Sequence, residues 1–83
     1  MQLEIITPTK TIFQGEVESA TFPGSKGSFQ VLNNHAALIS SLTKGKVKYK
    51  ENDREHELMV EGGVVEVRKN QIVLLVESVI EEE

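Results

Sequence analysis

The residues best suited to acid–base or metal chemistry near neutral pH are the two histidines, His35 and His56. The chain contains no cysteine, so it offers neither a thiolate nucleophile nor a thiolate metal ligand. His56 stands between two acids in "EHE" at 55–57, which are possible metal ligands, but no H-E-x-x-H spacing supports them. Since the segment is charged and lies beside a turn signal, we expect a solvated loop there.

The stretch "GSKG" at 24–27 sets a lysine between glycines, as some phosphate-binding loops do. It lacks the spacing of such a loop, and no helix signal follows it. Its glycines fit a β-turn instead, because glycine accepts positive φ angles. None of the serines stands in a G-x-S-x-G motif. The sequence therefore assigns no catalytic, cofactor-binding or metal-binding residue.

Two lysines at expected turns leave one alternative open. Lipoyl and biotinyl carrier domains are small, acidic β-sandwiches with a modified lysine at a hairpin tip, and Lys26 and Lys69 both lie at turn signals. Neither lysine has the methionine or acidic flanks of those modification sites, so we expect ordinary turn residues. A carrier domain and a small β-fold enzyme remain as alternative functions.

Length and charge limit the possible partners. The 83 residues predict one domain, 1–83, with a modest core. Thirteen acidic and nine basic residues give a net charge of -4, which argues against nucleic acid as a partner. The longest apolar run, at 72–76, is far too short to span a bilayer, so we expect no direct membrane insertion.

Alternating apolar and charged residues predict β-strands, most clearly in "KVKYK" at 46–50 and "VEVR" at 65–68. Turn signals separate such segments at short intervals, namely at 7–9, 23–27, 43–45, 51–53 and 69–71. This pattern is typical of an all-β sandwich or barrel.

Two segments need separate comment. The run at 72–76 is apolar on both faces, which predicts a strand covered on both sides, or one placed centrally with one face against a partner. Residues 36–42 fit either two helical turns or a strand, and β-branched Ile39 favours the strand. The four aromatic side chains are too sparse for base stacking and suit a core; they are Phe13, Phe22, Phe29 and Tyr49.

The stretch "SFQVLNNHAALISSL" begins as a strand, breaks at Asn33 and Asn34, presents His35 and then becomes apolar again. It is either an ordinary loop or a contact surface held out by a rigid scaffold. His35 has no second ligand at a useful spacing, and the small residues that follow it let a partner's backbone come close. We therefore expect this segment to bind a protein rather than a metal or a small substrate.

Three stretches, in order, resemble one family: "LEIITPTKTIFQGEVESATFPGSKGSFQVL", "NNHAALISSLTKGKV" and "EGGVVEVRKNQIVLLVES". Together they resemble the N-terminal β-sandwich of the epsilon subunit of F-type ATP synthase (delta in mitochondrial naming), over essentially the whole chain. The sequence departs from that family at Asn33-Asn34, where Pro-Gly is usual, and at Ala37, where proline is usual. Because asparagine can adopt the left-handed conformation, we expect Asn34 to keep the tight turn.

The resemblance implies a small, flattened β-sandwich of about ten short, mainly antiparallel strands. It implies a non-catalytic subunit of the central stalk that joins the gamma shaft to the c-ring and couples proton transport to ATP synthesis, with no cofactor or nucleotide of its own. Such a subunit is peripheral, in the F1 sector at the cytoplasmic face of the bacterial inner membrane. The family usually continues into inhibitory C-terminal helices; this chain ends in three glutamates at 81–83, so we expect that inhibition to be missing.

The resemblance also assigns contact residues. Thr7, His35 and Ser40 match positions that face the gamma subunit, and Lys26 and Ser28 match the turn that faces the c-ring. We expect the glycines to serve structural turns; they are Gly15, Gly24, Gly27, Gly45, Gly62 and Gly63.

Overall fold

The computed structural model describes residues 1–80, in which it contains eight strands and no helix. The strands are β1 (Gln2–Ile6), β2 (Thr11–Glu16), β3 (Ser19–Phe22), β4 (Phe29–Leu32), β5 (Leu38–Glu51), β6 (Arg54–Arg68), β7 (Gln71–Leu75) and β8 (Val79–Ile80). The all-β prediction is confirmed, with eight strands in place of about ten. The acidic run at 81–83 lies outside the described residues. None of the described residues forms a helix with the length and apolarity needed to cross a bilayer.

All eight strands belong to one sheet, in the order β2-β1-β7-β6-β5-β3-β4, with β8 paired to β6. The pairing of β1 with β7 is parallel, and the other pairings are antiparallel, as expected. β7 lies between β1 and β6, so the apolar run that predicted a central strand is central. Residues 38–42 are strand rather than helix, as favoured from Ile39.

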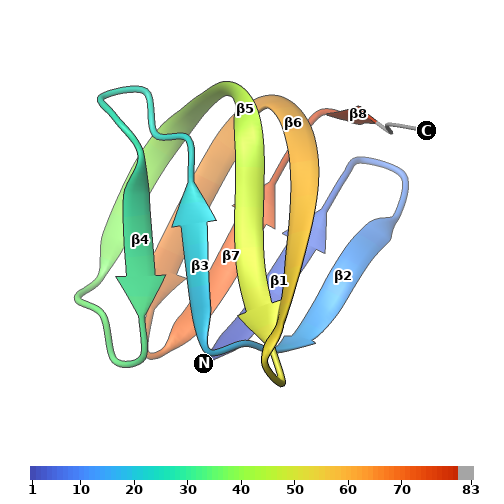
Figure 1. The fold of residues 1–83 in the computed structure, drawn as a ribbon. Helices are drawn as coiled ribbons and strands as arrows, with labels where there is room; N and C mark the ends of the chain where they lie inside the picture. Colours follow the sequence, from blue (N-terminus) through green and yellow to red (C-terminus); the bar gives the residue numbers. More distant parts are fainter. Residues whose placement is uncertain (81–83) are drawn as a thin grey trace.

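The β5–β6 hairpin turns this single sheet into two layers. The second half of β5 pairs with β3 at residues 48–50, whereas the second half of β6 pairs with β7 at residues 64–68. In Figure 1, β5 and β6 arch over the top of the molecule, with β3 and β4 in front and β7 and β1 behind. The two layers of the sandwich are therefore continuous through this hairpin.

Glycines make the bend, although not in the way the sequence predicts. Gly62 and Gly63 lie inside β6 with φ angles of 114° and 151°, where only glycine is comfortable. Gly15 and Gly45 also lie inside strands, so these four glycines do not mark turns. The turn predicted at 43–45 is absent because the Thr43 N–H bonds to the Pro23 carbonyl (2.9 Å) and β5 continues.

The remaining turn predictions are confirmed. Gly24 and Gly27 close a β-turn through a 3.0 Å bond from the Gly27 N–H to the Gly24 carbonyl. Asn34 adopts a positive φ of 64°, as expected for the break after β4. The β5–β6 and β6–β7 turns likewise use residues of positive φ, namely Asn52, Asp53, Lys69 and Asn70.

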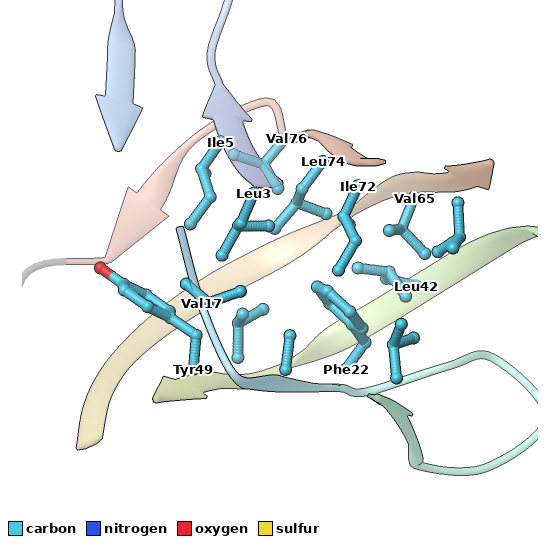
Figure 2. Packing of buried hydrophobic residues seen from close by; sticks show 14 of the residues in the cluster. Leu3, Ile5, Val17, Phe22, Leu42, Tyr49, Val65, Ile72, Leu74 and Val76 are labelled. Atoms are coloured by element: carbon cyan, nitrogen blue, oxygen red, sulfur yellow. The ribbon is translucent and has the colours of Figure 1, made fainter. Parts of the chain in front are cut away.

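The core lies between the two layers. Figure 2 shows Phe22 of β3 facing Leu3 of β1 and Ile72 and Leu74 of β7 across the sandwich. These side chains are completely buried, and each contributes about 1.5–3 kcal/mol relative to an exposed position. Of the four aromatic residues expected in the core, Phe22 and Tyr49 are buried, and Phe13 and Phe29 pack partly buried against it.

Candidate partner-binding surface

An exposed apolar surface lies on the outer face of the layer that contains β1, β7 and the ends of the hairpin. Ile39, Val64 and Leu75 are 72%, 43% and 52% exposed. Val64 pairs with Leu75, and Leu75 pairs with Ile6 of β1, so apolar side chains form a row across three strands. We call Ile6, Ile39, Val64 and Leu75 the apolar strip.

Along the same strands, the outward-facing side chains change from apolar to polar. At the opposite end of this outer face, the corresponding row is polar throughout: Arg68 pairs with Gln71, Gln71 with Gln2, and Gln2 with Glu16. The apolar strip is therefore confined to the end of the layer next to the glycine bend.

Thr7 lies at the β1 end of the strip. It lines a hollow of about 490 Å³ together with strip residues and the bend; the lining residues are Ile6, Thr7, Pro8, Gly63, Val64, Leu75, Val76 and Glu77. The Thr7 hydroxyl accepts a bond from the Lys10 N–H (3.2 Å) and donates to the Lys10 carbonyl (3.1 Å). The Thr7 side chain thus stabilises the turn between β1 and β2, and it lies beside the apolar strip.

Ser40 lies at the other side of the strip, on the first half of β5. It pairs with buried Val65, so its side chain starts on the core side of the sheet, where it is half-buried and donates to the Ser41 carbonyl (3.0 Å). The neighbouring Ser41 points outward and pairs with Val64 of the strip. Thr7 and Ser40 therefore flank one surface, at the first and the last of the four neighbouring strands β1, β7, β6 and β5.

His35 is at the far end of this layer. The His35 N–H closes a turn onto the Leu32 carbonyl (3.0 Å), and the turn is held by Asn70: the Asn34 N–H donates to Asn70 Oδ1 (2.8 Å), and Asn70 Nδ2 donates to Asn33 Oδ1 (2.9 Å). Asn70 also accepts from Gln2 at the start of β1 (3.2 Å). Since Thr7 follows the end of the same strand, it lies roughly 16 Å or more from the His35 loop.

The imidazole of His35 has a defined tautomer. Its Nδ1 lies 2.8 Å from the Ala36 carbonyl, which can only accept, so Nδ1 carries a proton and Nε2 is the acceptor of the neutral ring. The ring is therefore oriented by its own loop, and within residues 1–80 its Nε2 makes no hydrogen bond.

The turn predicted to face the c-ring lies close to Ser40. Lys26 and Ser28 are exposed, and the turn is joined to β5 by a Ser25–Ser41 hydroxyl contact of 2.9 Å and a 3.0 Å bond from the Ser25 N–H to the Ser41 carbonyl. The two predicted contact faces thus adjoin at β5. Any shaft-facing surface at Ser40 has the Lys26 turn at its border.

The "EHE" segment is part of β6, so the prediction of a solvated loop is wrong. His56 pairs with Tyr49, stacks on its ring at a centroid distance of 5.1 Å, and places Nε2 3.5 Å from Glu51 Oε1. Burial, together with the charge of Glu51, raises the pKa of Tyr49 above its ordinary value. Within residues 1–80, no three His, Asp or Glu side chains gather as metal ligands would.

A hollow of about 960 Å³ lies on the polar end of the β1–β2 side. Its charged groups are Glu4, Glu16, Glu18, Lys69 and the N-terminal ammonium of Met1, which pairs with Glu16 at 3.1 Å. Three acids against two cations leave this hollow with a net negative charge, which is unfavourable for a phosphate group.

Sequence reasoning anticipated a partner for one face of the strand at 72–76, but it missed the rest of the apolar strip and the role of Asn70. The run at 72–76 gave a signal because its outward residue Leu75 is as apolar as its inward ones. Asn70 gave no signal, since its contact with the His35 loop joins residues 36 positions apart.

The fold matches solved structures closely at low sequence identity. A chain of the Euglena gracilis mitochondrial ATP synthase, in a structure of its OSCP, F1 and c-ring, is similar with a TM-score of 0.88 and 18% identity; the match covers 94% of this chain and 51% of that chain. A chain of the Tetrahymena thermophila mitochondrial ATP synthase central stalk and c-ring gives 0.83 and 18%, over 96% and 65% of the two chains.

Two relatives found by sequence have a higher identity to this chain than these structures do, and both are named ATP synthase epsilon chain. The protein of Chlorobium limicola is 43% identical over 79 residues, covering 94% of this chain and 90% of that protein. The protein of Campylobacter jejuni is 42% identical over 81 residues, and there the chain spans 63% of the relative's length. A family model for the beta-sandwich domain of the ATP synthase Delta/Epsilon chain matches residues 1–82, and the chain therefore belongs to that family.

Proposed function

We propose that this chain is a non-catalytic subunit of the central stalk of an F-type ATP synthase, where it joins the gamma shaft to the c-ring. In that position it transmits rotation and so couples proton transport to ATP synthesis. It belongs to the F1 sector, peripheral to the membrane, at the cytoplasmic face of a bacterial inner membrane. Family membership favours this role over a carrier domain or a small β-fold enzyme.

The apolar strip is the observation that carries the proposal. Ile39, Val64 and Leu75 expose apolar side chains on adjoining strands, although polar residues occupy the equivalent positions at the other end of the same face. A contiguous apolar patch bordered by polar residues is the usual mark of a protein-binding surface. Of the three residues expected to face the shaft, Thr7 and Ser40 flank this strip and His35 lies at the far end of the layer; the position of the first two supports the gamma subunit as the partner of the strip.

The c-ring contact is proposed for the turn that contains Lys26 and Ser28. Both residues are exposed, and the turn projects beyond β3 and β4 without a salt bridge to Lys26 among the described residues. A free cation on a projecting turn suits polar loops that carry acidic groups. Lys26→Glu is expected to weaken binding to the c-ring more than binding to the shaft.

The chain is not expected to bind nucleotide. The hollow of about 960 Å³ is lined by three glutamates against one lysine and the N-terminal ammonium, so its net negative charge disfavours the phosphates of Mg-ATP. Isothermal titration of Mg-ATP into the chain should give no saturable heat. Micromolar binding would contradict this part of the proposal.

Two matched variants test the shaft contact. Leu75→Lys places a charge in the apolar strip, and Leu32→Lys makes the same change at a residue of equal exposure (52%) on β4, in the other layer. With the cognate gamma subunit immobilised, Leu75→Lys is expected to raise Kd about tenfold or more, which corresponds to about 1.4 kcal/mol or more. Leu32→Lys should bind like the wild type.

The outcomes separate the alternatives. Equal loss in both variants would show that the strip is not the contact surface. Failure of the wild-type chain to bind the gamma subunit would refute the proposed function itself. Melting temperatures of both variants should stay close to that of the wild type, because neither side chain is in the core.

A further inference from the structure

One edge of β5 is unpaired where it leaves the sandwich. β3 pairs with β5 at residues 48–50, so the first half of β5 has a neighbour, β6, on only one side. The turn at 24–27 covers part of the other side through the isolated bridge between Gly24 and Leu42. Beyond that bridge, at residues 38–40, the edge is open in the part of the chain that the structure describes.

The backbone direction at this edge follows from two hydrogen bonds. The Ser41 carbonyl accepts from the Ser25 N–H (3.0 Å), and the Thr43 N–H donates to the Pro23 carbonyl (2.9 Å). The backbone hydrogen-bonding groups of Ser41 and Thr43 therefore point away from β6. The N–H and carbonyl groups of successive residues in an antiparallel strand point alternately to the two sides, so the backbone groups of Ile39 point to the same side as those of Ser41. The N–H and carbonyl of Ile39 have no hydrogen-bond partner within residues 1–80.

The surroundings of Ile39 suit an added strand. Its side chain is 72% exposed on the outer face, opposite Glu66 and diagonal to Val64 of the apolar strip. No charged residue occurs between Ala36 and Thr43, although charges are the common means of protecting a free edge. A hollow of about 330 Å³ adjoins the edge, lined by residues of the 24–27 turn and by Phe29, Ile39, Ser40 and Ser41.

We propose that an extended segment of the shaft subunit adds to this edge as a further strand, with an apolar residue directly opposite Ile39. That residue would exchange two backbone hydrogen bonds with Ile39 and place its side chain next to that of Ile39 on the outer face. The inference rests on the proposed function, because it states how the shaft partner is held. His35 and Ser40, both expected to face the shaft, stand at the two ends of the segment that would be paired.

Proline provides a selective test. Ile39→Pro removes an N–H that the fold does not use, whereas Ser40→Pro removes one directed at β6 and is expected to lower the melting temperature strongly. Ile39→Ala is the matched control, because it loses the side chain and keeps the N–H. With the immobilised gamma subunit, Ile39→Pro should bind about tenfold more weakly than Ile39→Ala, the effect of one hydrogen bond of about 1–1.5 kcal/mol.

Amide hydrogen exchange gives a second readout that needs no variant. In the complex of the wild-type chain with the gamma subunit, exchange at the Ile39 amide should slow about tenfold or more, because a new backbone bond would protect an amide that has no partner within residues 1–80 of the free chain. Unchanged exchange at Ile39, or equal binding of Ile39→Pro and Ile39→Ala, would overturn the strand addition. Loss of binding by Leu75→Lys in the same experiment would leave the proposed function standing, whereas a wild-type chain that does not bind would refute both.

Discussion

Replacement of Gly63 by alanine tests whether the bend in β6 depends on glycine. Gly63 has a φ of 151°, and a Cβ built there would overlap the Leu75 carbonyl oxygen and approach Val76 Cγ1 to 3.0 Å. Gly27 is the matched control: its φ of 125° is equally unfavourable for alanine, but a Cβ there meets nothing within 4 Å. The pair therefore separates backbone strain from steric overlap with a rigid backbone group.

The expected magnitudes differ clearly. Strain alone costs about 1–2 kcal/mol, which is the expectation for Gly27→Ala. In Gly63→Ala the oxygen of Leu75 must also move, which disturbs the pairing of Val64 with Leu75, so we expect about 3–5 kcal/mol. A chain of 83 residues has a total stability of roughly 4–12 kcal/mol, so this variant loses a large part of it.

Urea unfolding followed by circular dichroism measures both effects. A loss of 3 kcal/mol corresponds to a fall in melting temperature of about 12–24 °C in a domain of this size. The dependence of the unfolding free energy on urea should keep its slope, because the surface exposed on unfolding does not change. If Gly63→Ala and Gly27→Ala lose the same stability within about 0.5 kcal/mol, the overlap argument is refuted.

Three further variants test the loop, the core and the hydroxyl of Tyr49. Asn70→Asp removes the amide donor to Asn33 and should cost about 1 kcal/mol, with faster hydrogen exchange in the His35 loop measured by NMR. Phe22→Ala should cost about 3–5 kcal/mol in urea unfolding, because Phe22 is completely buried. The raised pKa of Tyr49 means that the unfolded chain loses this proton first, so stability falls as pH rises above about 10; Tyr49→Phe should reduce that fall, measured as urea midpoints between about pH 8 and 11.

The position of a strand could be predicted from the sequence where one face of that strand is polar and the other apolar. The alternation at 46–50 and 65–68 specified both strands and the residues they bury, because side chains alternate between faces with a period of two. The turn predicted at 43–45 was wrong, because Gly45 lies inside β5. A side chain at Gly45 would collide with Pro23, so this glycine allows close packing rather than a turn. A glycine kept for lack of space and a glycine kept for a turn look alike in a single sequence.

The arrangement of the candidate site was less predictable. Thr7, His35 and Ser40 were assigned together by resemblance, yet they come from a turn after β1, a loop before β5 and a position within β5. Their separation depends on which strands pair, and the parallel pairing of β1 with β7 is not encoded in local alternation. Asn70 escaped prediction for the same reason, because its hydrogen bonds join two turns that are brought together only by the sheet.

The outer face of β6 and β7 separates the requirements of folding from those of binding. In both strands, successive side chains point alternately into the core and outward. Val65 and Ile72 would therefore be buried whatever residues occupied the outward positions. At one end those positions hold Arg68 and Gln71, and at the other they hold Val64 and Leu75, within the same pair of strands. Since polar residues fold as well there, burial of Val64 and Leu75 by the sandwich cannot explain them, whereas burial by a partner can. The glycine bend next to them then has two effects: it closes the sandwich and sets the border of the surface at which the partner docks.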